Sequence, residues 1–291
     1  MAGGRGARAR ARATTTDEPK YTMADQVKRF AEAKKKNVTR VMAIDDVYDG
    51  SFLRDKRVLV TGANRGIGLA LCEELTRNGA KVIATCRASS AALDGLKPEQ
   101  IIRDVDVTSA SSCRAMAAQI DEPLDIVINN AGYFYEPVEK IDSMNFDEQL
   151  KMIDICAVGP LRVSSALYNA GKIKTPGGKI AMITSQGGSV AWREVQNPSG
   201  GDYGHHMSKS AANMGSKLLA QELKHKGIMV QVLHPGFNKT DMTAKYAKIW
   251  EIEGAVDPSV GAKRVMHEIG LMAPDYNGLF INCEDGLQIP W

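Results

Sequence analysis

The stretch RVLVTGANRGIG, residues 57–68, decides the fold of this chain. Residues 58–60 form a short apolar run that, together with Arg57, predicts a buried strand, and the residues after the turn, up to Asn78, predict a helix. Glycines between a strand and a helix let the backbone approach a pyrophosphate, whose charge the free N–H groups at the helix start can bind. Because strand, turn and helix follow one another in this order, the stretch predicts a dinucleotide site.

The same alternation of strand and helix continues along the chain. Runs such as residues 126–128 are apolar without interruption, which is typical of strands buried on both faces. Alternation of this kind indicates βαβ units with right-handed crossovers. We therefore predict an α/β fold, a single Rossmann-type doubly wound parallel sheet with helices on both faces, over residues 51–291. Further strands are expected at 81–86, 101–107, 124–132, 178–185, 228–236 and 278–286, and helices at 111–120, 145–170, 205–226 and 259–269.

The composition narrows the class of protein. The five cysteines are scattered through 291 residues without a CxxC pair, which argues for a reducing compartment and against a disulfide framework or a zinc site. No bound metal is expected. No apolar run approaches 18 residues, so the sequence predicts no transmembrane segment.

Charge separates a basic N-terminal extension, residues 1–50, from the rest. Up to Arg40 the chain has eleven Lys and Arg against four Asp and Glu, and the remainder has 26 against 30. An acidic body does not indicate specific DNA binding. Residues 1–20 cannot build a core, and a helix is expected from Thr22. This extension has two possible roles. It is a remnant of a plastid or mitochondrial targeting segment, or it is a docking arm that makes the chain a subunit of a hetero-complex. Without targeting, a cytoplasmic protein is expected.

The second predicted strand indicates which dinucleotide is bound. NAD-binding proteins of this fold hold the ribose hydroxyls with an acid at the end of that strand. Here Cys86 stands at that place and Arg87 follows it, while Arg65 lies inside the glycine turn. Two guanidiniums and no carboxylate suit a 2′-phosphate, so the sequence predicts NADP(H).

Three motifs together resemble the short-chain dehydrogenase/reductase family. They are TGxxxGIG at residues 61–68, NNAG at 129–132 and PGxxxT at 235–240, and the match covers residues 57–291. The segments HPGFNKTDM and GLQIPW resemble the small carbonyl-reductase and C-factor-like branch. The resemblance implies that the cofactor is held by Thr61, Gly62, Asn64, Arg65, Gly66, Ile67, Gly68, Arg87, Asp106, Val107, Asn130, Ala131, Gly132, Lys209, Pro235, Gly236 and Thr240.

The resemblance also implies a catalytic Ser, Tyr, Lys and Asn, of which two are present. Ser185 matches the serine that polarises a carbonyl, and Lys209 matches the lysine that lowers the tyrosine pKa. His205 stands at the tyrosine position and Cys156 at the asparagine position. Tyr203 lies two residues from His205 and therefore points to a different side of the predicted helix.

The altered tetrad leaves two hypotheses open. Lys209, one turn from His205, should lower the histidine pKa, and a neutral imidazole is a weak acid that can still donate an N–H bond. On the first hypothesis, the chain reduces a small carbonyl substrate with NADPH, or oxidises the corresponding alcohol in the reverse direction. Alternatively, it is a catalytically impaired cofactor-binding subunit. The resemblance further implies a homo-oligomer through the helices at 145–170 and 205–226.

Overall fold

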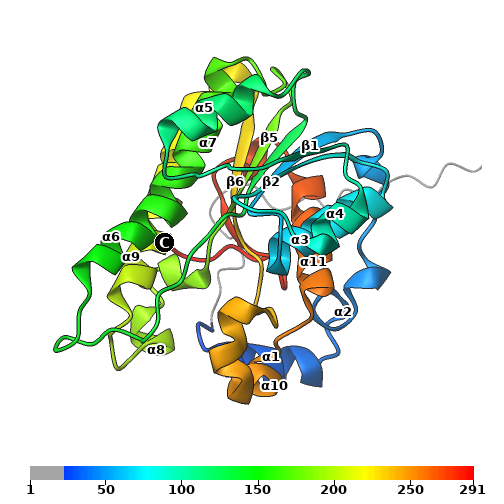
Figure 1. Cartoon of the computed structure of the whole chain (residues 1–291). Helices are drawn as coiled ribbons and strands as arrows, with labels where there is room; N and C mark the ends of the chain where they lie inside the picture. Colours follow the sequence, from blue (N-terminus) through cyan, green and yellow to red (C-terminus); the bar gives the residue numbers. More distant parts are fainter. Residues whose placement is uncertain (1–22) are drawn as a thin grey trace, which may run out of the picture.

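A seven-stranded parallel sheet forms the centre of the protein (Figure 1). The computed structural model describes residues 23–291. The strand order is β3-β2-β1-β4-β5-β6-β7, which reverses direction between β1 and β4 and places the topological switch point at their carboxyl ends. This confirms the predicted fold. The strands are β1 (Arg57–Thr61), β2 (Lys81–Thr85), β3 (Gln100–Ile102), β4 (Ile126–Asn129), β5 (Lys179–Ile183), β6 (Met229–His234) and β7 (Phe280–Asn282).

Helices cover both faces of the sheet because the strand side chains alternate between two cores. Val58 and Val60 pack on one side and Leu59 on the other, all fully buried. One face carries α3 (Gly66–Arg77), α4 (Ala91–Leu96) and α11 (Pro258–Leu271), and the other carries α5 (Ala110–Ala118), α7 (Gly159–Asn169) and α9 (Tyr203–Leu223).

The helix predicted over 145–170 is interrupted. Its first part, α6 (Phe146–Ile153), passes through a π-helical turn η3 (Asp154–Val158) into α7. This turn was not predicted, and neither were the short helices α4, α8 (Arg193–Gln196), η6 (Asp241–Ile249) and α10 (Trp250–Glu253). Among the described residues, no helix is long and apolar enough to cross a membrane. The remaining short helical turns are η1 (Ile44–Asp46), η2 (Ser51–Leu53), η4 (Gln186–Gly188), η5 (Lys224–Lys226) and η7 (Pro274–Tyr276).

The N-terminal segment from residue 23 packs against the α/β body. Helix α1 (Gln26–Lys35) is capped by Asp25, whose side chain accepts the Lys28 N–H; the predicted cap Thr22, like residues 1–20, lies outside the described residues. Helix α1 lies beside α10 (Figure 1). Next comes α2 (Thr39–Met42), where Arg40 pairs with Glu268 of α11. The domain boundary at residue 50 stays a prediction.

Candidate active site

The glycine turn is shaped by close backbone contacts that a side chain would prevent. A Cβ on Gly68 would lie 2.1 Å from the carbonyl oxygen of Gly62. Gly62 itself has a φ of 65°, in the left-handed region that favours glycine. The start of α3 therefore lies directly against the turn. Its N-cap residue is Arg65, whose side chain makes no capping hydrogen bond, so no side chain competes with an anion for the helix start.

The NNAG segment holds this turn in place. The Thr61 hydroxyl accepts the backbone N–H groups of Asn130 and Ala131, each at 3.0 Å. The Asn130 side-chain amide donates to the carbonyl oxygens of Thr61 and Gly62 at 3.0 and 3.3 Å. These bonds join the ends of β1 and β4, on the two sides of the switch point. Of the neighbouring predicted cofactor residues, Asn64, Gly66 and Ile67 are half-buried and Gly132 is exposed.

The end of β2 carries positive charge and no carboxylate. Cys86 is buried, and burial raises the pKa of its thiol, so it is neutral. Arg65 and Arg87 are exposed, and within residues 23–291 neither guanidinium forms an ion pair. Ser90 donates to the Asn64 carbonyl oxygen at 2.7 Å, which ties the loop after β2 to the glycine turn. Both arginines are thus exposed in the segments that follow β1 and β2.

The predicted adenine edge follows β3. The Thr108 N–H donates to the Asp106 carboxylate at 2.9 Å, and this bond lowers the pKa of Asp106. Val107 is buried against Gly159, on which a Cβ would lie 2.9 Å from a Val107 methyl group. The backbone of α7 therefore approaches this edge closely.

Ser185 and His205 converge on one point of the site. The Ser185 Oγ and the His205 Nε2 lie 3.2 and 3.1 Å from the position that a Cβ on Gly187 would occupy. The Ser185 hydroxyl accepts the Gly187 N–H at 3.0 Å, so its own proton is free to be donated. Ser185 follows β5 as the N-cap of η4 and His205 lies in the first turn of α9, so two predicted catalytic residues are brought together.

The surroundings of His205 keep its imidazole neutral. Its ring lies 4.7 Å from the Phe134 ring, centre to centre and tilted by 47°, and its Nδ1 is buried without a hydrogen-bond partner in the described part of the chain. Burial, with the Lys209 ammonium as the next cause, holds the pKa of His205 well below its usual 6.5. Near neutral pH this residue can donate an N–H bond but carries no acidic proton of its own.

Sequence reasoning missed the residues that surround the histidine from other elements. Lys245 of η6 places its Nζ 3.5 Å from the centre of the Phe134 ring and 3.1 Å from Glu136. Asp202, the N-cap of α9, has a φ of 55°, and burial raises its pKa to about 6. Neither Phe134 nor Lys245 belongs to a sequence motif, so only the fold brings them to His205.

Cys156 lies inside the π-helical turn η3. It is buried, its sulfur accepts the Tyr133 N–H and its thiol donates to the Tyr133 carbonyl oxygen, both at 3.4 Å. The thiol is therefore engaged with the segment after NNAG. π-Helical turns occur mostly as single interruptions of α-helices, frequently at functional sites.

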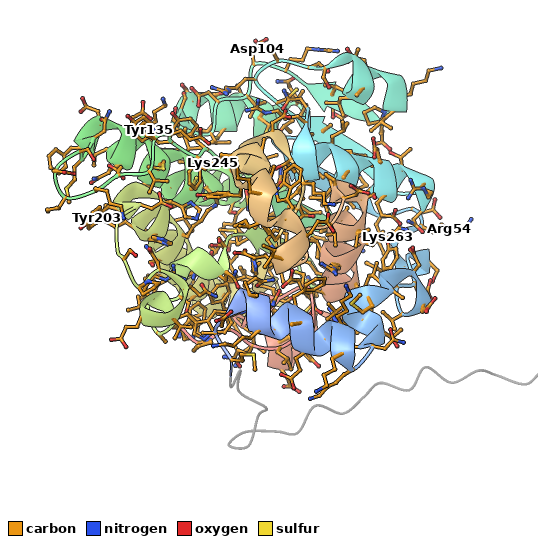
Figure 2. The ribbon with its side chains drawn as sticks, turned by 90° about the horizontal axis from the view of Figure 1, so that it is seen from below. Arg54, Asp104, Tyr135, Tyr203, Lys245 and Lys263 are labelled. Atoms are coloured by element: carbon orange, nitrogen blue, oxygen red, sulfur yellow. The ribbon has the colours of Figure 1, made fainter. Side chains whose placement is uncertain are left out.

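The remaining predicted residues lie on α9 and on the segment between β6 and η6. Lys209 is half-buried, and its ammonium has no hydrogen bond within residues 23–291. Thr240 lies against the glycine turn, 3.6 Å from the place of a Cβ on Gly66. Pro235 and Gly236 are buried just before it. Figure 2 shows Tyr203 at the margin of the molecule, apart from Lys245.

A family model described as short chain dehydrogenase matches residues 56–249. The chain belongs to this family. The match begins one residue before β1 and ends at the last residue of η6, so it contains the glycine turn, NNAG, Ser185 and Lys209. The resemblance inferred from the motifs is confirmed.

Two relatives show how far the similarity extends. The 1-hydroxy-2-glutathionyl-2-methyl-3-butene dehydrogenase of Rhodococcus sp. (strain AD45) is 32% identical over 239 residues, which cover 80% of this chain and 99% of that protein. The C-signal protein of Myxococcus xanthus is 32% identical over 184 residues, covering 61% of this chain and 99% of that protein.

Solved structures of carbonyl reductases share the fold of this dehydrogenase family member. The NADPH-bound carbonyl reductase from chicken fatty liver has a TM-score of 0.70 at 26% identity, covering 82% of this chain and 100% of that chain. The carbonyl reductase Sniffer of D. melanogaster has a TM-score of 0.69, also at 26% identity and with the same coverage. The similarity to carbonyl-reductase-like proteins is thereby confirmed.

Proposed function

We propose that this protein binds NADP(H) and reduces a carbonyl substrate. The observation that carries the proposal is the convergence of the Ser185 hydroxyl and the His205 imidazole. Two exposed arginines accompany it, Arg65 in the glycine turn and Arg87 after β2. The relatives support it, because one similar structure is an NADPH-bound carbonyl reductase. Arg65 and Arg87 would hold the 2′-phosphate, and the start of α3 the pyrophosphate.

NADPH supplies a hydride for the carbonyl carbon. The chain provides hydrogen bonds to the oxygen on which negative charge develops, one from the Ser185 hydroxyl and one from a His205 Nε2–H. Such donors fixed in advance stabilise developing charge more than mobile water does. The Phe134 ring lies 4.7 Å from the imidazole, and the Lys245 ammonium lies over that ring.

Proton delivery should be slow in this site. A neutral imidazole is a much weaker acid than a phenol beside a lysine, so we expect modest turnover. General acid catalysis typically raises the reaction rate about 10²–10⁴-fold, so loss of the strong acid should lower turnover by up to that factor. Two observations favour a second function, a cofactor-binding subunit without turnover. The low pKa of His205 leaves the site without a strong acid, and the Cys156 thiol is bonded to Tyr133 at the position where the family has an asparagine.

Turnover measurements separate the two functions. NADPH oxidation is followed with a panel of aldehydes and ketones for the unchanged protein, His205→Phe and His205→Tyr, with the exposed His225→Phe as the matched control. A reductase should lose activity in His205→Phe and gain it in His205→Tyr. Equal activity in His205→Phe would remove this residue from the mechanism. NADPH binding without turnover in any variant would establish the subunit.

We also propose two kinds of assembly. Exposed apolar side chains on α6 and α9, among them Phe146, Leu150, Met214 and Leu218, supply a face for a homo-oligomer. Leu223, which also lies on α9, is buried in the chain's own core and is not part of this face. The arm before residue 23 would attach the protein to an acidic partner, or direct it to an organelle. Because residues 23–40 pack on the body, only residues 1–22 are assigned to this role.

A further inference from the structure

We propose that helix α1, outside the region matched by the family model, belongs to the active site. Gln26 and Arg29 are positioning residues that hold the turn after Ser185 and the turn before Thr240. The inference rests on the proposed function, because it concerns the geometry of the same reductase site. Neither residue lies in a family motif, since the family match begins at residue 56.

The first contact of α1 is with Gln186, the residue directly after Ser185. The Arg29 guanidinium donates to the Gln186 side-chain oxygen at 2.8 Å, and the Gln186 amide donates to the Gln26 side-chain oxygen at 3.4 Å. From the opposite side, Arg193 donates to the Gln186 backbone carbonyl at 3.1 Å. Gln186 is therefore fixed at both its side chain and its backbone.

Fixing Gln186 fixes the catalytic pair. Gln186 and Gly187 are consecutive residues of η4, and the Gly187 N–H is the donor that orients the Ser185 hydroxyl. Gly187 also lies against the His205 ring. A displacement of η4 would thus change the distance between the Ser185 Oγ and the His205 Nε2. Small displacements of this kind reduce catalysis strongly, because donors must lie within hydrogen-bond distance of the reacting oxygen.

The second contact of α1 is with Glu284, after β7. Gln26 donates to the Glu284 carboxylate at 3.4 Å, and the Arg29 guanidinium lies 3.8 Å from it, with both ionic side chains about 8% exposed. Glu284 accepts the Phe237 N–H at 3.4 Å and packs against Gly236, on which a Cβ would lie 2.7 Å from its Cγ. The same two residues of α1 therefore reach the PGxxxT turn.

The third contact is with α10, which follows η6 and Lys245. Gln26 donates to the Glu253 carbonyl oxygen at 3.0 Å, and the Phe30 ring occupies the space beside Gly254. Figure 2 shows α1 running beneath this segment. Helix α1 thus joins three segments of the site that are far apart in sequence: η4, the PGxxxT turn and the end of α10.

A buried ion pair could instead serve stability alone, so the test separates local from global effects. Arg29→Gln is compared with Arg57→Gln. The control arginine has a side chain that is 14% exposed, pairs with Glu99 at 2.6 Å and lies at the amino end of β1, away from the site. Hydrogen exchange of the full chain without substrate is followed by mass spectrometry. Arg29→Gln should speed amide exchange of residues 186–189 and 236–238 about tenfold, because these segments lose the stabilisation of one charged hydrogen bond. Arg57→Gln should leave both segments unchanged.

Kinetics supply the second measurement. In Arg29→Gln we expect kcat to fall about tenfold while the Kd for NADPH stays within twofold, and Arg29→Lys should restore part of kcat. Unchanged exchange at 186–189, or exchange that rises equally over the whole chain, would overturn the positioning role. If the unchanged protein has no turnover, the reductase proposal fails by itself, and the exchange measurement still decides on α1.

Discussion

Replacing Arg87 should change which cofactor the protein prefers. The unchanged chain should bind NADPH more tightly than NADH, because two exposed arginines and no acid follow β1 and β2. Arg87→Ala removes one of the two guanidiniums and leaves the glycine turn intact. We therefore expect weaker NADPH binding and unchanged NADH binding. Arg87→Asp should narrow the preference further or reverse it, since a carboxylate at this place can accept the ribose hydroxyls.

The magnitude follows from the exposure of the side chain. A hydrogen bond to a charged group contributes roughly 1.5–3 kcal/mol, and the lower end applies to Arg87 because water competes at its exposed guanidinium. About 1.4 kcal/mol corresponds to a tenfold change in Kd. Arg65 remains, so the preference for NADPH should shrink in Arg87→Ala without vanishing.

Fluorescence titration of both cofactors, at low and at high salt, measures the effect. Arg54→Ala is the matched control, because Arg54 is equally exposed but precedes β1 at the opposite end of the strand. Figure 2 labels this residue at the margin of the molecule. Equal affinity of the unchanged protein for NADPH and NADH would refute the reasoning, and so would an equal loss of both cofactors in Arg87→Ala.

Three further predictions concern stability and assembly. Burial lowers the pKa of His234 to about 4, below the 6.5 of an unfolded chain, so unfolding takes up a proton between these values and stability falls as pH drops from 6.5 to 4. This one group accounts for up to about 3 kcal/mol, and denaturant unfolding of His234→Gln should show a weaker pH dependence. Light scattering should show an oligomer that Leu218→Glu dissociates, and a monomeric unchanged chain would contradict this. Deleting residues 1–22 should leave the NADPH Kd unchanged and abolish co-purification with a larger assembly; retention of the same partners would exclude docking by the arm.

The sequence was sufficient wherever a signal is local. The strand at 57–60 and the glycines after it are consecutive, so their pattern predicts both the sheet and the turn against which Gly68 lies. Ser185 and Lys209 were found because each belongs to a motif. Ser185 follows β5 at the carboxyl edge of the parallel sheet, and Lys209 lies one turn from His205 in α9.

The contacts between segments far apart in the sequence were not predicted, because such contacts leave no periodic pattern in the sequence. Gln26 and Gln186 are 160 residues apart, and nothing in either segment indicates the other. Lys245 resembles any surface lysine until the fold places it over Phe134. The three leucines of α9 illustrate the same limit, since Leu218 is exposed while Leu223 is buried, although both fit one helical pattern.

The π-helical turn of residues 154–158 adds one residue to a segment that is otherwise α-helical. An α-helix advances about 100° per residue, so one additional residue rotates everything after it by that angle. Removing a residue here would restore a regular helix and turn Val163 and Leu167, both now fully buried, toward water. Surface loops tolerate insertions and deletions, but the number of residues between Phe146 and Asn169 cannot change without repacking a whole face of the sheet.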